Sequence, residues 1–84
     1  MTTLNKHILI VDDEREITAP LATYLNKHGY KTSIAHDGHD MDKVLRRENI
    51  DLIVLDIMMP GEDGLSICRR LQDNKQIPVI LLTA

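Results

Sequence analysis

The chain has 84 residues, of which 43% are hydrophobic and 27% charged, and its formal net charge at pH 7 is −3. This composition is typical of a soluble globular domain and excludes an intrinsically disordered chain. The negative net charge argues against nucleic acid as a direct partner of this segment. No apolar run is long enough to cross a membrane, and the single cysteine, Cys68, cannot form an internal disulfide, so we expect a chain of the reducing cytoplasm.

The first segment predicts a strand followed by a helix. Residues 7–11 form a short apolar run, which is typical of a buried strand. Asp13 or Glu14 then opens a helix, because acidic side chains are favourable at a helix N-terminus. Proline removes a helical hydrogen bond, so a kink or a local break is expected between Glu16 and Pro20. The predicted buried stripe of this helix repeats every four residues: Ile17, Leu21 and Leu25.

The next segment predicts an edge strand and a second helix. Residues 30–36 are of mixed polarity, as expected for a strand at the edge of a sheet. Asp37-Gly38 predicts a turn, because both residue types favour turn conformations. The helix that follows ends at Asn49, and its apolar face is formed by Met41, Val44 and Leu45.

The remaining segment predicts a central strand, a third helix and a fourth strand. Residues 51–55 contain an unbroken apolar run, which predicts a strand buried on both faces, and Asp56 follows it directly. Proline and glycine soon after Asp56 predict a loop. A fourth strand is expected over residues 77–82, with Thr83 at its carboxyl end. The third helix lies between these strands, and its apolar face is formed by Leu65, Cys68 and Leu71.

Three carboxylates follow two of the predicted strands. Asp12 and Asp13 come directly after the first strand, and Asp56 comes after the central one. If these strands are parallel neighbours, their axes lie roughly 4.8 Å apart, so the three side chains converge at one edge of the sheet. Carboxylates this close repel one another, and a hard cation such as Mg²⁺ or Mn²⁺ relieves the repulsion.

A second group of titratable residues has a spacing that matches no recognised metal-ligand pattern, and turn formation accounts for its Asp-Gly pair. We therefore predict no metal site among His36, Asp37, His39, Asp40 and Asp42. Cys68 lies on a predicted apolar helix face, which indicates a packed thiol rather than a nucleophile.

Three stretches together resemble the receiver domain of bacterial two-component response regulators. They read ILIVDDE at residues 8–14, LIVLDIMMPGEDG at residues 52–64 and PVILLTA at residues 78–84. Each stretch alone is a weak signal, whereas their order and spacing are specific. The stretch DIMMPGEDGLSICRRL at residues 56–71 is most similar to regulators that carry a winged-helix DNA-binding domain downstream.

The alternation of strands and helices indicates an α/β protein with a parallel sheet and right-handed crossovers. The resemblance implies a flavodoxin-like doubly wound sheet with strand order 2-1-3-4. It further implies that residues 1–84 form one truncated receiver domain, without the fifth strand and the last two helices of the family fold. The fourth strand would then be a bare apolar edge, which predicts a homo-oligomer.

The resemblance implies a phosphoacceptor rather than an enzyme with turnover. Asp56 would accept a phosphoryl group from a sensor histidine kinase, and Thr83 would contact that group and reorient on activation. The implied Mg²⁺ ligands are Asp12, Asp13, Asp56 and the backbone carbonyl of Met58. The family also has a lysine at the end of its fifth strand, and its absence from these residues predicts reduced phosphoryl transfer. DNA binding would belong to an effector domain outside them.

Two other functions stay open at this point. One is a non-signalling structural fragment of the same domain, which assembles through its exposed edge strand and faces. Oligomeric state and response to a phosphodonor separate it from a signalling module. The other is an aspartate-nucleophile phosphatase, but those enzymes carry a second aspartate two residues after the nucleophile, where this chain has Met58.

Overall fold

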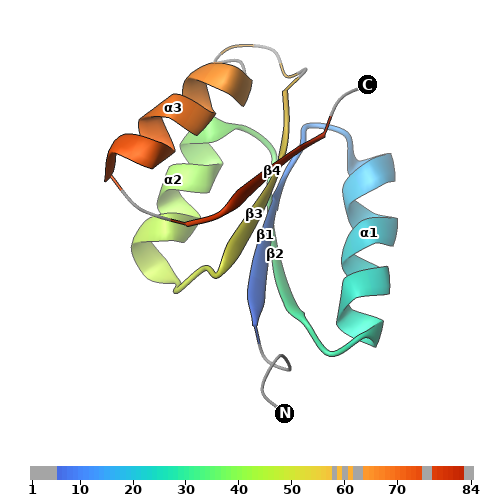
Figure 1. Ribbon diagram of the computed structural model, residues 1–84. Coiled ribbons are helices and arrows are strands. Elements are labelled where there is room, and N and C mark those ends of the chain that lie inside the picture. Colours follow the sequence, from blue (N-terminus) through green and yellow to red (C-terminus); the bar gives the residue numbers. More distant parts are fainter. Residues whose placement is uncertain (1–5, 58, 60, 62–63, 75–76, 83–84) are drawn as a thin grey trace.

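Strands and helices alternate along the part of the chain that the structure describes (Figure 1). The structure is a computed structural model, and it describes residues 6–57, 59, 61, 64–74 and 77–82. In chain order the elements are β1 (His7–Val11), α1 (Arg15–Lys27), β2 (Lys31–Ala35), α2 (Gly38–Arg47), β3 (Leu52–Asp56), α3 (Gly64–Asn74) and β4 (Val79–Leu82).

The described strands form one parallel sheet in the order β2-β1-β3-β4, which confirms the predicted flavodoxin-like arrangement. Every residue of β1 is buried, and so are the last four residues of β3. Strands covered on both faces need apolar side chains on both faces, which explains their unbroken apolar runs. β2 lies at an edge, in agreement with its mixed polarity. Because all the pairings are parallel, β1 and β3 end at the same edge of the sheet.

Helices lie on both faces of the sheet, and an apolar cluster fills each interface. α2 and α3 cover one face, and α1 covers the other (Figure 1). The larger cluster lies beneath α2 and α3 and includes Leu9, Met41, Ile53, Leu55 and Ile67. The smaller cluster lies beneath α1 and is formed by Ile8, Ile10, Ala22 and Val54.

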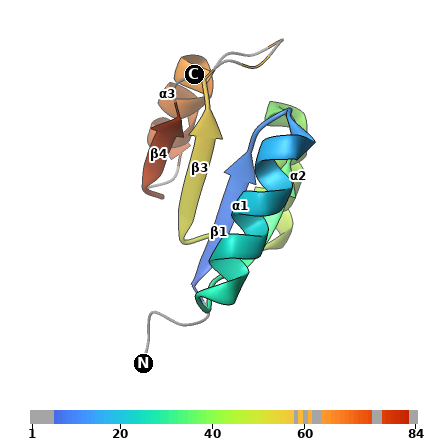
Figure 2. The same ribbon diagram turned by 90° about the vertical axis from the view of Figure 1, so that its right-hand side faces the viewer.

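The two faces are covered unequally. Figure 2 shows α1 in front of β1, whereas no described helix lies in front of β3 and β4 on this face. Ile80 of β4 pairs in register with Val54, which belongs to the α1-side cluster, and the Ile80 side chain is 50% exposed. β4 is also an outer strand of the described sheet and has exposed apolar residues, Ile80 and Leu81, as expected for the predicted apolar edge.

The buried face of α1 differs from the predicted one. Thr18 and Ala22 are buried, whereas Ile17 is 45% exposed, so its place in the predicted stripe is wrong. Leu21 and Leu25 are half-buried and pack against the α1-side cluster. The four-residue spacing correctly predicts a helix, but small or polar residues such as Ala22 and Thr18 do not stand out as the centre of its buried face.

α1 continues without interruption through Pro20, so the predicted local break is wrong (Figure 1). Proline has no N–H to donate to the carbonyl group four residues earlier, which belongs to Glu16. Both Glu16 and Pro20 are exposed, so water can satisfy that carbonyl group. The helix tolerates the proline because the lost hydrogen bond faces solvent.

The N-terminus of α2 lies where the sequence predicts a turn. Asp37 is the N-cap residue, and its carboxylate accepts a hydrogen bond from the Asp40 N–H at 2.8 Å. Gly38 is already helical, so the turn prediction is corrected to a helix start. The predicted apolar face of α2 is confirmed, because Met41, Val44 and Leu45 are all buried.

In α3 the buried face is shifted from the predicted one. Leu71 is buried and Cys68 packs against the larger cluster, as predicted. Leu65, however, is 51% exposed, and Ile67 is fully buried in its place. Gly64, Ile67 and Leu71 share one face at helical spacing, and Leu65 points away from it.

None of the helices in the described ranges is long and apolar enough to cross a lipid bilayer. The longest of them, α1, has 13 residues and an exposed charged surface. A membrane-spanning helix needs roughly 20 apolar residues.

Candidate functional site

Three carboxylates meet at the carboxyl edge of the sheet. Asp12 and Asp13 follow β1, and Asp56 is the last residue of β3. One carboxylate oxygen from each residue lies within 4.8 Å of the other two. Asp12 and Asp56 are buried, and Asp13 is exposed. The convergence expected from neighbouring parallel strands is therefore present, and we call these three residues the acidic cluster.

The backbone of Asp12 is bonded to the end of β2. Its N–H donates to the Ala35 carbonyl oxygen at 3.1 Å, and its carbonyl oxygen accepts from the Nδ1 of His36 at 3.0 Å. Asp12 Oδ1 accepts from the Glu14 N–H at 2.9 Å, which closes the turn into α1. The side chain and both backbone polar groups of Asp12 thus have defined partners.

Asp56 is held by strand pairing and by a close approach of α3. It lies opposite Leu82 in the register of β3 and β4, and the Ile57 N–H donates to the Leu82 carbonyl oxygen at 3.3 Å. The Gly64 N–H donates to the Ile57 carbonyl oxygen at 3.4 Å. A Cβ at Gly64 would lie 2.8 Å from the Asp56 carbonyl oxygen, closer than such atoms approach, so glycine is required there. The loop after Asp56 therefore starts and ends against β3.

The predicted site residues Met58 and Thr83 lie outside the described residues. Met58 follows Ile57 in the sequence, and Thr83 follows Leu82. Their neighbours Ile57 and Leu82 are joined by a backbone hydrogen bond beside Asp56.

Within the acidic cluster, the surroundings of Asp12 disfavour its negative charge. Burial raises the pKa of the Asp12 carboxyl group above its ordinary value. The charges of Asp56 and Asp13 and a hydrogen bond with Asp56 act in the same direction, while the hydrogen bond from the Glu14 N–H lowers the pKa. A cation placed among these carboxylates would favour their ionised forms. Three carboxylate oxygens in one place are a donor set that suits Mg²⁺ or Mn²⁺.

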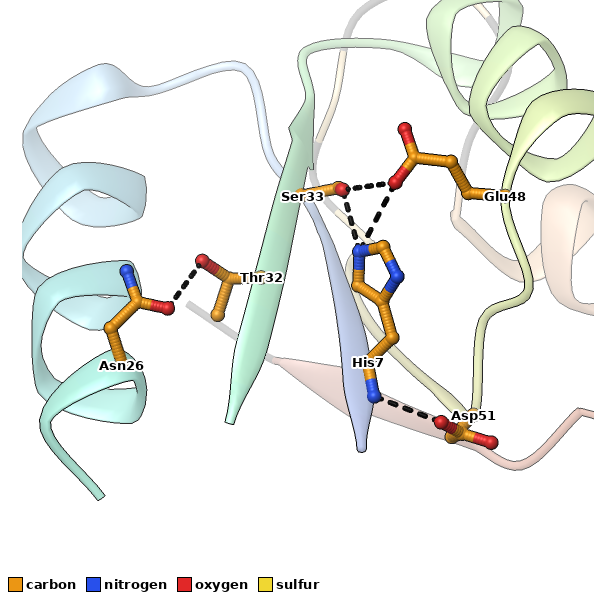
Figure 3. Close-up of polar contacts among 6 residues, drawn as sticks. All are labelled: His7, Asn26, Thr32, Ser33, Glu48 and Asp51. Carbon is orange, nitrogen blue, oxygen red and sulfur yellow. Dashed lines mark hydrogen bonds and ion pairs between the residues drawn. The ribbon is translucent and has the colours of Figure 1, made fainter. Parts of the chain in front are cut away.

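A second polar cluster lies at the opposite, amino edge of the sheet (Figure 3). The Nε2 of His7 lies 2.7 Å from the Oγ of Ser33 and 3.3 Å from the Oε1 of Glu48. The Ser33 hydroxyl donates to the same Glu48 oxygen at 3.0 Å, and the His7 N–H donates to the Oδ2 of Asp51 at 2.8 Å. We call these four residues the amino-edge cluster. No local sequence pattern predicts this cluster.

The amino-edge cluster is not arranged for nucleophilic catalysis. In a serine–histidine–carboxylate relay, the hydroxyl and the carboxylate bond to different ring nitrogens. Here Ser33 and Glu48 both contact the Nε2 of His7, and the serine hydroxyl is already donated to the carboxylate. His7 is 5% exposed, so the ring gains partners in place of water. The role of these contacts is structural.

The titratable residues of 36–42 have separate roles in the fold. His36 bonds to the backbone of Asp12, and Asp37 caps α2. Asp42 of α2 accepts from Arg70 of α3, with 2.9 Å between Oδ1 and Nη1. His39 is exposed. The contact from His36 to Asp12 could have been inferred, because His36 follows β2 just as Asp12 follows the neighbouring β1.

Comparison with known proteins identifies relatives along nearly the whole chain. Residues 8–84 match the response regulator receiver domain family. The transcriptional regulatory protein AfsQ1 of Streptomyces coelicolor, a curated relative, is 43% identical over 77 residues. That match covers 92% of this chain and 34% of the relative, so the chain spans about one third of the relative's length.

Two solved structures share this architecture. The BeF3-activated N-terminal receiver domain of Klebsiella pneumoniae RstA is 40% identical with a TM-score of 0.87, and the match covers 93% of this chain and 67% of that one. The Thermotoga maritima response regulator TrrA, in complex with Mg²⁺-BeF, is 40% identical with a TM-score of 0.85. That match covers 94% of this chain and 70% of the other. From its family match, its relatives and its fold, the chain belongs to the response regulator receiver domain family.

Proposed function

We propose that this chain is the phosphoacceptor module of a two-component system and that Asp56 accepts the phosphoryl group. The observation that carries the proposal is the position of Asp56 at the end of a buried central strand, within 4.8 Å of the carboxylate oxygens of Asp12 and Asp13. Receiver domains are signalling phosphoacceptors rather than enzymes with turnover, and this chain belongs to that family.

The proposed chemistry is a phosphoryl transfer between two side chains. A carboxylate oxygen of Asp56 attacks the phosphorus of a phosphohistidine on a sensor histidine kinase. The new O–P bond forms as the P–N bond breaks, and the electron pair of that bond stays on the histidine ring of the kinase. β3 and the return of the chain at Gly64 hold Asp56 in a fixed position for the attack.

We propose that Asp12, Asp13 and Asp56 hold a Mg²⁺ or Mn²⁺ ion, with the backbone carbonyl of Met58 as a further ligand. The donor set supports this assignment, because hard oxygen ligands suit both ions. When bound, the cation supplies positive charge that neutralises the phosphoryl oxygens. The related Thermotoga maritima regulator was solved in complex with Mg²⁺-BeF, which is in line with this assignment.

The family and one relative support proposals for the partner, the compartment and the output. We propose a sensor histidine kinase as phosphodonor, in the cytoplasm, and a hydrogen bond from Thr83 to the phosphoryl group. Thr83 follows Leu82, the residue paired with Asp56 in the sheet, which supports this role. The relative AfsQ1 is a transcriptional regulatory protein, so we propose that the output is transcriptional, through a domain outside these 84 residues.

Intact mass spectrometry after incubation with Mg²⁺ and acetyl phosphate tests the proposal. The wild-type chain is expected to gain the mass of one phosphoryl group, and Asp56→Asn is expected to gain none. Asp51→Asn is the matched control, because Asp51 lies just before the other end of the same strand and should leave phosphorylation unchanged. A folded wild-type chain that gains no phosphoryl group would contradict the proposal.

The rate of phosphorylation tests how much the lysine of the family pattern contributes to phosphoryl transfer. The lysine is not among the 84 residues, so we expect them to react slowly when assayed alone. Removing one such contact costs on the order of 2–4 kcal/mol of transition-state stabilisation. A longer chain that contains the lysine should therefore be phosphorylated faster under the same conditions.

The exposed edge of β4 favours a second proposal, self-association of the 84 residues. β4 is an outer strand of the described sheet, and Ile80 and Leu81 are exposed. Such an edge offers backbone hydrogen-bonding groups to another chain. Light scattering over a concentration series should show a dimer or larger species for the wild-type chain and a monomer for Ile80→Lys. A monomer at every concentration would contradict this second proposal without affecting the first.

A further inference from the structure

We infer that His36 is a positioning residue for the acidic cluster. Its ring holds the backbone of Asp12, and through that backbone it holds the carboxylates of Asp12 and Asp13. The inference rests on the proposed cation site. It assigns a role to a residue that the sequence motifs of the site do not include.

The strand register brings His36 to Asp12. β1 and β2 are paired with Val11 opposite Ala35, so the residues that follow each strand meet at the carboxyl edge. The Asp12 N–H donates to Ala35, and the Asp12 carbonyl oxygen lies 3.0 Å from the Nδ1 of His36. A carbonyl oxygen can only accept, so the Nδ1 of His36 carries the hydrogen.

This hydrogen bond controls a peptide plane shared by two members of the cluster. The Asp12 carbonyl group belongs to the planar peptide unit that joins Asp12 to Asp13. Fixing the direction of that carbonyl group fixes the plane, and with it the start of the Asp13 backbone. On the other side of the Asp12 Cα, the Asp12 N–H is held by its hydrogen bond to Ala35. With both neighbouring peptide units held, the Cα–Cβ bond of Asp12 keeps its direction toward Asp56.

His36 is the described side chain that donates to this carbonyl group. Without the ring, the peptide unit can rotate while β1 and β2 stay paired through their own ladder. The three carboxylate oxygens would then meet less often in the arrangement that suits a cation. Groups that orient metal ligands from outside typically change metal affinity by about 10- to 100-fold when they are removed.

Calorimetric titration with Mg²⁺ alone tests the inference in three variants of the 84-residue chain. His36→Leu should weaken Mg²⁺ binding by about tenfold. His36→Asn should stay within about threefold of wild type, because the asparagine amide nitrogen can take the place of Nδ1 as donor. His39→Leu is the matched control, and it should bind as wild type because His39 is exposed.

Two measurements on the metal-free chain separate this inference from the proposed function. Nitrogen NMR of the His36 ring should show a hydrogen on Nδ1. The Asp13 N–H shares its peptide plane with the Asp12 carbonyl group, so its amide resonance should shift in His36→Leu relative to wild type. Unchanged Mg²⁺ affinity in a folded His36→Leu chain would overturn the inference, and so would a neutral ring protonated only at Nε2. If the wild-type chain bound no Mg²⁺, the proposed cation site and the positioning role would both fall, even with the hydrogen bond present.

Discussion

The two edges of the sheet both bury polar side chains, but the interactions differ in sign. At the amino edge, His7, Ser33 and Glu48 offer donors and acceptors to one another (Figure 3). At the carboxyl edge, the acidic cluster brings like charges together, and burial raises the pKa of the Asp12 carboxyl group. Complementary polar groups stabilise a fold, whereas gathered like charges cost stability until a ligand relieves them.

One strand connects the two edges. β1 begins at His7 and is followed by Asp12, so the two clusters lie roughly 17 Å apart along five residues of extended chain. The difference between them supports our proposal that the carboxyl edge carries the function, while the amino edge maintains the fold. Substitutions at the two edges should therefore separate stability from cation binding.

The largest effect is expected where α3 approaches the carboxyl edge. Gly64→Ala places a Cβ against the backbone of Asp56 and Ile57, so β3 and α3 must move apart. We expect a loss of about 3 kcal/mol in the free energy of unfolding, measured by urea denaturation. Mg²⁺ binding should weaken as well, because Asp56 moves with the strand.

Gly61→Ala is the matched control for this substitution. Gly61 has a φ of +84°, and a Cβ there would meet nothing within 4 Å. The cost should be limited to about 1 kcal/mol for a left-handed backbone conformation. If Gly64→Ala were no more destabilising than Gly61→Ala, the close approach of α3 to the Asp56 backbone would not be the constraint that we describe.

A smaller loss of stability is expected at the amino edge. His7→Leu leaves Ser33 and Glu48 without the ring nitrogen that they share, which should lower the free energy of unfolding by about 2 kcal/mol. His7→Gln should recover part of this loss, because its amide can donate from a similar position. Mg²⁺ affinity of the folded His7→Leu chain should equal that of wild type. Weaker Mg²⁺ binding would show that the two edges are not separable.

The smallest effect has the opposite sign and depends on pH. The pKa of Asp12 is raised in the folded chain, so the folded state binds its proton more tightly than the unfolded state does. Stability should therefore fall as pH rises from the ordinary value of 3.8 through the raised pKa, and it should stay lower above that range. Asp12→Asn has no such pH-dependent loss of stability, so it should be more stable than wild type at pH 7 without metal.

Urea denaturation of both chains at pH 3 and pH 7 measures this difference in stability. A Mg²⁺ titration of both chains then compares their affinity for the cation. Asp12→Asn should be more stable than wild type at pH 7 and yet bind Mg²⁺ more weakly. A less stable Asp12→Asn chain in metal-free buffer would argue against charge repulsion at the carboxyl edge.

The acidic cluster could be predicted from the sequence because its geometry needs little detail. Two apolar runs predict neighbouring strands, and parallel strands end together, so Asp12 and Asp56 meet whatever the side-chain packing. The same reasoning places His36 at that edge. The prediction for His36 says only that it belongs to no metal site, and it misses the contact with the backbone of Asp12.

The amino-edge cluster depends on details that local patterns do not contain. Its members come from β1, β2 and the segment after α2, so it requires the strand register and the end point of a helix. The same limitation explains the errors at Ile17 and Leu65. Each lies on a helix whose rotation is set by the packing of other residues, Thr18 and Ile67 among them, against the sheet.

Unfolding with and without Mg²⁺ tests most directly whether the carboxyl edge is a cation site. Mg²⁺ at one hundred times its Kd should raise the free energy of unfolding of the wild-type chain by about 2.7 kcal/mol. Asp13→Asn, which changes the exposed member of the acidic cluster, should gain much less at the same concentration, and Asp51→Asn should gain as much as wild type. No gain in wild type, or an equal gain in Asp13→Asn, would contradict this account of the site.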